Sequence, residues 1–465
     1  MKLVIITLAF ILMSISSYAQ DLPGTWHGVA QTPDNRKITF VFNIEKLDQG
    51  YLTAMSVPTF NVADISIPKT SLQEGVLHID GSTIGMNYKG TWNSETDRFE
   101  GVYTEGQIQL DLNLSKGQPE TTKLNRPQEP TQPYPYYAEE ISFRNIEEDI
   151  TLAGTITKPQ QGEKFPVVIL ISGSGKHDRN ASMMTHRPFL VLSDHLTRNG
   201  IAVLRYDDRG YGKSTGSFDE ATTADFAKDV LSAVSYLKTR SDIDQSAIGL
   251  VGHSEGGIIA PLVANQSEDI AFIVSLAPTG IPGNEVAVAQ SKRLRPFPVP
   301  DEISFEKNVR KALEIVTSDR DLEEKTKLLN THNTSYLEPI LKSLGAKDEN
   351  ITRFIANETQ SLLKPWNRYF YTYDPAIEFG KLTIPVLIVH GEKDIQVEPT
   401  SNQRVIKAAL NRNTYSDSKF VLLEDHNHLF QECESGKIEE YKEIDQTISP
   451  VALNLIRSWI MDITE

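Results

Sequence analysis

The sequence predicts an α/β fold with a doubly wound, mostly parallel sheet, preceded by a small all-β domain of barrel-like form. Two patterns support this prediction. Apolar and polar residues alternate up to Gly117, whereas after Ala138 short apolar runs are separated by helical patterns. A proline-rich segment lies between the two regions. We therefore expect a β-rich head, a linker and a larger α/β body.

Residues 1–19 are typical of an export signal. Lys2 provides a charged start, an apolar run extends from Leu3 to Met13, and Ser17-Tyr18-Ala19 forms a cleavage site before Gln20. The apolar run is shorter than the roughly 20 residues that a membrane span needs. We therefore expect a protein exported to the periplasm or the extracellular space, without stable membrane insertion.

Residues 20–117 form the predicted β-rich accessory domain. Its strands are expected to bury one face, because apolar residues recur at every second position in Ile38, Phe40, Phe42 and Ile44 and in Ile108, Leu110, Leu112 and Leu114. Residues 118–137 form the predicted linker, since proline resists both helix and sheet. The prolines of this segment are Pro119, Pro127, Pro130, Pro133 and Pro135.

Residues 138–465 form the predicted α/β body. Its short runs are apolar on both faces, as strands of a helix-covered sheet must be. They are Val167–Ile171, Ile201–Tyr206, Ile248–Val251, Phe272–Leu276, Pro385–Val389 and Phe420–Leu423. Ser449-Pro450 is typical of a helix start. Residues 281–375 lack such runs but keep helical spacing, so we expect a helical cap inserted into the sheet.

The composition argues against several function classes. The formal net charge of −16 disfavours phosphate backbones and anionic membranes, so nucleic acid is not an expected partner. The single cysteine, Cys433, excludes an intramolecular disulfide and a cysteine-based zinc site. The sequence contains no His-Glu-x-x-His or comparable cluster, so we expect neither a metal nor a cofactor. The oligomeric state stays open.

The sharpest motif is Gly252-His253-Ser254-Glu255-Gly256, which lies between a buried apolar run and a helical stretch. In this context the two glycines permit a strained strand-to-helix turn that lifts the serine hydroxyl clear of the sheet edge. Ser254 is therefore the predicted nucleophile.

A serine hydroxyl needs a histidine base held by a carboxylate, and in this kind of site the chain order is Ser, acid, His. Asp394 follows the run Pro385–Val389 and is the predicted acid. His428 follows the last apolar run and is the predicted base. The same two loops also contain competitors, which are Glu392 and Glu398 for the acid and His426 for the base.

The oxyanion that forms when Ser254 attacks needs hydrogen-bond donors. The segment Ile171-Ser172-Gly173-Ser174-Gly175 ends one of the apolar runs. We expect the Ser174 amide to bind the oxyanion together with the Glu255 amide. The turn Asp208–Ser214 ends another run, and we expect its arginine to anchor it as a support for neighbouring loops.

The elbow, the turn Asp208-Arg209-Gly210-Tyr211-Gly212-Lys213-Ser214, Asp394 and the His428 loop together resemble bacterial α/β-hydrolases of the esterase EstD type, broadly grouped with serine aminopeptidase S33-like hydrolases. The resemblance extends from about Ala138 to the C-terminus. It implies a carboxylic ester hydrolase with the triad Ser254, Asp394 and His428. The β-rich head is similar to accessory domains of exported members. One departure is Ser172-Gly173, where the family usually has His-Gly.

The function predicted from the sequence is an exported serine esterase that forms an acyl-enzyme on a small-molecule or glycan-linked ester. A peptidase of the same fold is the first alternative, and it would need a cap carboxylate, such as Glu302 or Glu306, for a substrate amino group. The second alternative is a glycan-binding module whose body is a degenerate enzyme. Ser254 at the elbow disfavours a dehalogenase, which would have an aspartate there.

An aromatic cluster precedes the run that delivers Asp394, and it consists of Trp366, Tyr369, Phe370, Tyr371 and Tyr373. These rings are predicted either to dock the cap on the body or to line an apolar pocket for the acyl group. The sequence leaves both roles open.

Overall fold

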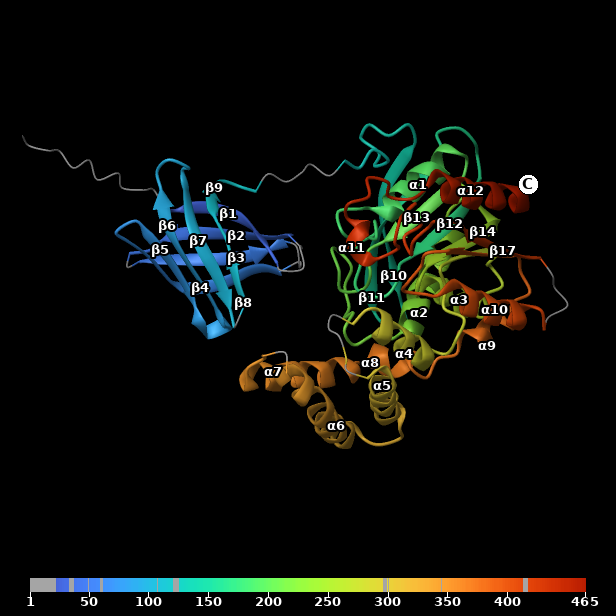
Figure 1. Cartoon of the computed structure of the whole chain (residues 1–465). Coiled ribbons are helices and arrows are strands. Elements are labelled where there is room, and N and C mark those ends of the chain that lie inside the picture. Colours follow the sequence, from blue (N-terminus) through green and yellow to red (C-terminus); the bar gives the residue numbers. More distant parts are fainter. Residues whose placement is uncertain are drawn as a thin grey trace, which may run out of the picture. The chain divides into compact units, whose positions relative to one another are not determined.

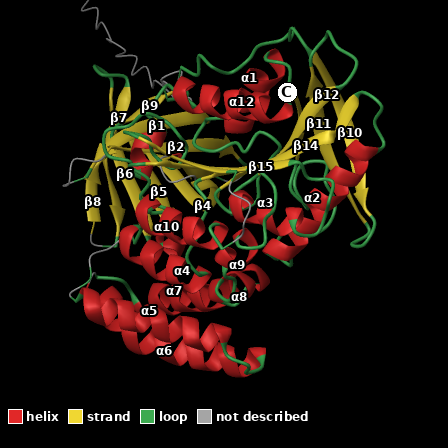
Figure 2. Cartoon of the chain, turned by 90° about the vertical axis from the view of Figure 1, so that its right-hand side faces the viewer, coloured by secondary structure: helices red, strands yellow, loops and turns green. Residues whose placement is uncertain are grey.

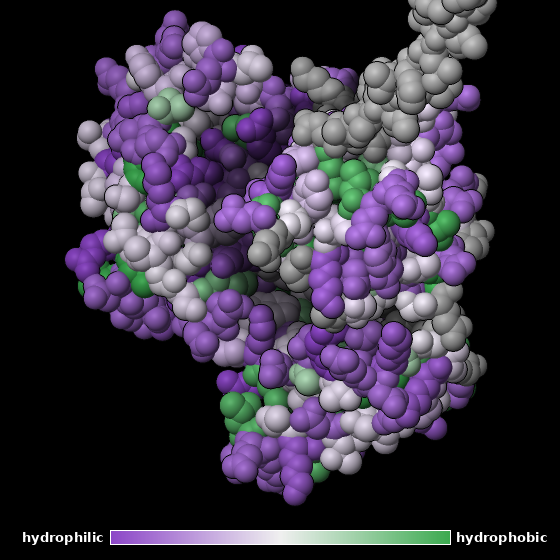
Figure 3. Space-filling model, turned by 90° about the vertical axis from the view of Figure 1, so that its left-hand side faces the viewer, coloured by the Kyte–Doolittle hydropathy of each residue, from purple (hydrophilic) through white to green (hydrophobic). Residues whose placement is uncertain are grey.

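The computed structural model describes residues 22–32, 37–48, 50–58, 62–106, 108–119, 125–295, 299, 301–343, 345–412 and 417–465. The predicted export signal, residues 1–19, lies outside them. The chain divides into two compact units, residues 1–123 and 124–465. Among the described residues, no helix is both long and apolar enough to cross a membrane. The face in Figure 3 is mainly hydrophilic, with small hydrophobic patches.

The first unit is a closed antiparallel barrel (Figure 1). Its strands are β1 (Gly24–Gln31), β2 (Lys37–Lys46), β3 (Tyr51–Val57), β4 (Val62–Gln73), β5 (Val76–Gly81), β6 (Met86–Asn93), β7 (Arg98–Glu105), β8 (Ile108–Asp111) and β9 (Leu114–Lys116). Strand β1 pairs with β9, β9 with β7 and β7 with β6, which closes the sheet. Trp26, Phe42, Tyr88 and Phe99 fill the interior. The predicted β-rich, barrel-like region is confirmed.

The second unit contains an eight-stranded mixed sheet in the order β10-β11-β13-β12-β14-β15-β16-β17. The strands are β10 (Tyr137–Asn145), β11 (Ile150–Lys158), β12 (Phe165–Ile171), β13 (Ala202–Tyr206), β14 (Ile243–His253), β15 (Phe272–Leu276), β16 (Val386–Gly391) and β17 (Ser418–Leu423). The strands from β13 to β17 run parallel, whereas β10 and β11 are antiparallel to their neighbours. All six predicted runs are strands, and β10 and β11 were not predicted.

Helices cover both faces of this sheet (Figure 2). One face packs against α1 (Pro188–Arg198) and α12 (Pro450–Thr464). The other face packs against α2 (Thr223–Lys238), α3 (Gly256–Ala264) and α10 (Pro399–Leu410). Alternate residues of each strand contribute to the two cores, because side chains of a strand point to opposite faces. The short helix α11 (Ile438–Tyr441) precedes α12.

In the described part of the chain between β15 and β16, where the sequence predicts helices, there are six helices. They are α4 (Gly283–Arg293), α5 (Glu302–Thr317), α6 (Leu322–Ser343), α7 (Asp348–Leu362), α8 (Pro365–Phe370) and α9 (Pro375–Phe379). Helices α5, α6 and α7 lie together, away from the helices that flank the sheet (Figure 1). We call α4–α8 the insertion helices.

Candidate active site

Ser254 lies in the turn between β14 and α3, with a φ of +54°. The turn is crowded, since a Cβ atom on Gly252 would lie 2.0 Å from the carbonyl oxygen of Gly256. Glycine is therefore required at position 252. The Ser254 amide donates to the Leu276 carbonyl at 2.8 Å, which ties the turn to the end of β15. This is the strand-turn-helix geometry that a nucleophile elbow needs.

Asp394 and His428 lie in direct contact beyond the ends of β16 and β17. Nδ1 of His428 is 2.6 Å from Oδ2 of Asp394, and both side chains are buried. The second carboxylate oxygen of Asp394 accepts hydrogen bonds from the amides of Gln396 and Val397. Burial by itself would raise the pKa of Asp394, but His428 and these donors outweigh it and hold the pKa below its ordinary value. The carboxylate is thus ionised and fixed in orientation.

The competing residues have other partners. Glu398 caps α10 by accepting from the amides of Thr400 and Ser401, and these hydrogen bonds outweigh its partial burial and lower its pKa to about 2. Glu392 accepts from the Asp425 amide at 3.2 Å. His426 bonds through Nε2 to the Ser449 hydroxyl at 2.6 Å. The structure therefore brings Asp394 to His428 and leaves the competitors in capping and loop contacts.

His253 connects the elbow to the His428 loop. Its Nε2 is 2.9 Å from the carbonyl oxygen of His428, and the two ring centroids are 4.7 Å apart. Burial, together with the nearby ring of His428, lowers the pKa of His253 to about 3, so this ring stays neutral and donates its Nε2 proton. The residue before the predicted nucleophile thus supports the residue predicted as its base.

The predicted oxyanion loop, Ile171 to Gly175, lies beside the elbow. A Cβ atom on Gly173 would lie only 3.1 Å from Cβ of Ser254, so glycine permits this close approach. Among the described residues, the amides of Ser174 and Glu255 have no hydrogen-bond acceptor. Both amides remain available to a ligand, as oxyanion donors require.

Asp208 holds this loop near its start and just beyond its end. Its Oδ1 accepts from the Ser172 hydroxyl at 2.9 Å, and its Oδ2 accepts from the His177 amide at 2.7 Å. Burial raises the pKa of Asp208 to about 7, against the opposing effect of these two donors. Ser172 stands where the family that this chain resembles usually has histidine. Its hydroxyl has a specific partner in this chain, the Asp208 carboxylate.

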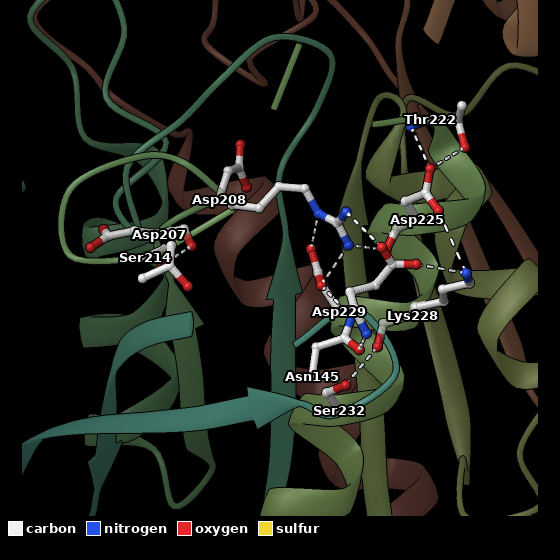
Figure 4. A network of polar contacts seen from close by, with 12 residues as sticks. Asn145, Asp207, Asp208, Ser214, Thr222, Asp225, Lys228, Asp229 and Ser232 are labelled. Carbon is white, nitrogen blue, oxygen red and sulfur yellow. Dashed lines mark hydrogen bonds and ion pairs between the residues drawn. The ribbon is translucent and has the colours of Figure 1, made fainter. Parts of the chain in front are cut away.

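The turn that contains Asp208 is anchored by Arg209, as predicted. The guanidinium donates to both carboxylate oxygens of Asp229 in α2, at 2.7 and 2.8 Å. Asp229 also accepts from Asn145 at 2.8 Å (Figure 4). This buried network fixes the turn against the helix.

Sequence reasoning missed two acids at this site, which are Asp208, whose carboxylate holds the loop, and the buried Glu255 side chain. Oε1 of Glu255 accepts from the Thr223 hydroxyl at 2.7 Å and from Nε1 of Trp366 at 2.6 Å. The available signal was position, because each acid lies two residues beyond the end of a buried strand, at the edge of the sheet where the site forms.

The aromatic cluster packs closely. The rings of Trp366 and Phe370 stack with centroids 4.9 Å apart and an interplanar angle of 8°. Phe370 is buried in the core beside α2 and α3, and Tyr371 and Tyr373 pack against the same core.

Among the described residues, no group of three or more His, Cys, Asp or Glu could hold a metal ion.

Known proteins with similar sequences include an esterase and thiohydrolases. Esterase EstD from Thermotoga maritima is 28% identical over 301 residues, which cover 63% of this chain and 62% of that protein. Thiohydrolase aneE from Aspergillus aculeatus is 37% identical over 82 residues, covering 17% and 26%. The chain thus matches less than two thirds of the length of these relatives. The predicted resemblance to EstD is confirmed.

Among solved structures, the esterase Pf2001 from Pyrococcus furiosus is 14% identical, with a TM-score of 0.44, and the match covers 70% of this chain and 90% of that one. Est1E from Butyrivibrio proteoclasticus, solved with ferulic acid bound, is 20% identical, with a TM-score of 0.40, and covers 70% and 97%. The family model of the X-Pro dipeptidyl-peptidase (S15 family) matches residues 148–413, more than half of the chain. The chain belongs to this S15 family.

Proposed function

We propose that this protein is an exported serine hydrolase that cleaves carboxylic esters through an acyl-enzyme intermediate. The observation that carries the proposal is the 2.6 Å contact between Asp394 and His428, in loops beyond the same sheet edge as the strained Ser254. A carboxylate that fixes one nitrogen of a histidine leaves the other nitrogen to act as a base.

The proposed reaction has two halves. Ser254 Oγ forms a bond to the ester carbonyl carbon while its proton passes to Nε2 of His428, and the amides of Glu255 and Ser174 stabilise the oxyanion. The bond to the alcohol oxygen then breaks, and the alcohol leaves with that proton. Water repeats the two steps on the acyl-enzyme and releases the acid and Ser254.

A peptidase is the second candidate, and the family match favours it. However, Glu302 and Glu306, the two cap carboxylates that the sequence suggests for a substrate amino group, already have cationic partners. Glu302 pairs with Arg295, and Glu306 pairs with Lys292 and Arg310. Their engagement supports an ester rather than an amino-terminal peptide as the substrate.

The proposed arrangement around this site keeps the domain organisation predicted from the sequence. We take the sheet with helices on both faces as doubly wound, and the region of the insertion helices, about 281–375, as a cap. We take residues 20–117 as an accessory domain and residues 118–137 as a linker.

Export is tested by N-terminal sequencing of the protein recovered outside the cytoplasm, which should begin at Gln20. Recovery of the intact Met1 end would contradict export by cleavage.

The function is tested by comparing the hydrolysis of acyl-nitrophenyl esters of increasing length with that of aminoacyl-prolyl anilides. We expect ester hydrolysis to dominate and Ser254→Ala to reduce its turnover by at least about 10⁴-fold, since the members of a triad act as a unit. A fluorophosphonate should label Ser254. Faster cleavage of the anilides would favour the peptidase, and labelling of another serine would exclude Ser254 as the nucleophile.

A further inference from the structure

The Glu255 carboxylate is a buried acid whose hydrogen-bond partners are neutral. Its side chain is 4% exposed, and Oε1 accepts from both Thr223 and Trp366. Burial raises its pKa above the ordinary value, while hydrogen bonds from Trp366, Thr223 and Ser174 oppose that rise. Burying a carboxylate costs free energy unless hydrogen bonds satisfy it. The hydrogen bonds to Glu255 therefore fix the positions of its side chain and of its partners.

These partners belong to segments that are distant in the sequence. Thr223 is the first residue of α2, and Trp366 belongs to α8, 111 positions along the chain from Glu255. Ser174 belongs to the predicted oxyanion loop. One side chain therefore joins the elbow to α2 and to the insertion helices.

The same residue contributes its main chain to the site, because the free Glu255 amide follows Ser254 directly. The Ser174 amide is the second free donor. A donor acts on an oxyanion only when it is held at hydrogen-bond distance from the developing charge, and small displacements are expensive.

We propose that the Glu255 side chain is a positioning residue for the oxyanion site, which sets the direction of the Glu255 amide and couples it to the insertion helices through Trp366. This inference rests on the proposed function. It assigns no contact with substrate to the carboxylate. The insertion helices then influence turnover as well as substrate access.

The chain provides a matched control at the other end of α3. Nδ2 of Asn265 donates to the Glu378 carbonyl at 2.9 Å and to its carboxylate at 2.8 Å, which links α3 to α9. This link also joins α3 to a segment between β15 and β16, but it lies away from the two amides. Asn265→Ala therefore removes a comparable anchor without touching the oxyanion site.

The experiment compares Glu255→Ala, Glu255→Gln, Trp366→Phe and Asn265→Ala in the full chain. It measures kcat and KM on one nitrophenyl ester, Tm, and the inhibition constant of a trifluoromethyl ketone. That ketone forms a hemiketal oxyanion with a nucleophilic serine, so its affinity reports the oxyanion site. Removing one oxyanion donor costs about 10²–10³ in kcat, so misplaced donors should cost about 10–100-fold.

We expect Glu255→Ala to lower kcat and the ketone affinity together by about 10–100-fold, with little change in KM. Glu255→Gln should restore most of both, because its carbonyl still accepts from Thr223 and Trp366. Trp366→Phe keeps the stacked ring but loses the Nε1–H donor, so it should lower both quantities in parallel. Asn265→Ala should change Tm alone.

The inference is overturned if Trp366→Phe and Glu255→Ala leave kcat and ketone affinity at wild-type values, whatever their effect on Tm. If Glu255→Ala does not fold, Trp366→Phe decides alone. An inactive Ser254→Ala shows that the proposed reaction stands, so a null result in the other variants would then count against the positioning role only.

Discussion

Ser254 occupies the left-handed backbone region, which costs a residue with a side chain about 1–3 kcal/mol. The strain is held by the hydrogen bond to Leu276 and by two glycines that no larger residue could replace at this spacing. At the same scale, Asp394 and His428 are buried together, and Oδ2 of Asp394 satisfies Nδ1 of His428. The strained backbone of Ser254 thus lowers local stability, while its surroundings fix its geometry.

The first prediction concerns the roles of residues that share a loop. Asp394→Asn and His428→Ala should each reduce turnover by orders of magnitude, because the base would lose its orientation or be absent. Glu392→Gln and His426→Ala should change turnover little, since their partners are loop and capping groups. Steady-state kinetics on one ester would check this. The reverse ranking within either loop would reassign that role.

The second prediction concerns Asp208. Burial raises the pKa of this carboxyl group from 3.8 to about 7. Between these values the folded state holds a proton that the unfolded state has lost, so the stability contributed by this group falls as the pH rises from about 4 to about 7. Above about pH 7 this effect is complete and the contribution is constant. The total loss is at most about 4 kcal/mol.

Asp208→Asn removes this titration, and denaturant unfolding of both proteins between pH 4 and 8 measures it. The free energy of unfolding of the wild type should decrease relative to that of the variant across this range. A difference that does not change with pH would show that Asp208 is ionised throughout.

At the scale of elements, the insertion helices attach to the sheet through the aromatic rings of α8. Phe370 lies in the core beside α2 and α3, and a Cβ atom on Gly283 of α4 would lie 1.8 Å from the Phe370 carbonyl oxygen. Helices α4 and α8 therefore pack at the closest distance that glycine allows. Burial and stacking favour docking as the role of Phe370.

The third prediction tests this docking role. Phe370→Ala should lower the free energy of unfolding by about 3–5 kcal/mol, as is typical of a phenylalanine removed from a core, and should leave the preferred acyl chain length unchanged. Phe354→Ala, at an exposed position of α7, is the control and should cost little stability. Denaturant unfolding and a series of esters measure the two effects. A changed chain-length preference with normal stability would instead place Phe370 in the acyl pocket.

At the scale of the whole molecule, each of the two units has a hydrophobic core of its own. The second unit includes residues before its first strand, because Arg126 donates to the carbonyls of Lys442 and Ile444. Gln128 bonds to the main chain of Thr447 and Ile448. These contacts hold the loop that leads into α12 and lies next to the His428 loop in sequence.

The fourth prediction separates the units. A chain that starts at Asn125 should retain the Tm of the second unit and the turnover proposed for it. A chain that starts at Ala138 should have a Tm lower by several degrees, since each lost hydrogen bond contributes about 0.5–1.5 kcal/mol. Arg126→Ala with Gln128→Ala in the full chain isolates these two side chains and should reproduce part of that loss, since Glu129 and Tyr136 also bond to the second unit. Equal Tm values for the two shortened chains would show that these contacts contribute nothing.

The sequence by itself determined the strands of the sheet from β12 to β17, the barrel-like head and the elbow around Ser254. These features depend on local patterns, namely apolar runs, period-two alternation and glycine spacing, which act through short-range sterics and burial. The sequence did not predict the antiparallel strand β10, because most of its residues are exposed and show no apolar pattern.

Only the tertiary structure decided which carboxylate faces His428. Asp394 and Glu392 differ by two positions in one loop, and their side-chain directions depend on how that loop packs. The same holds for Glu255 and Trp366, whose contact joins positions 111 residues apart. No local pattern encodes such a contact, because its free energy comes from burying both partners together after the elements have packed.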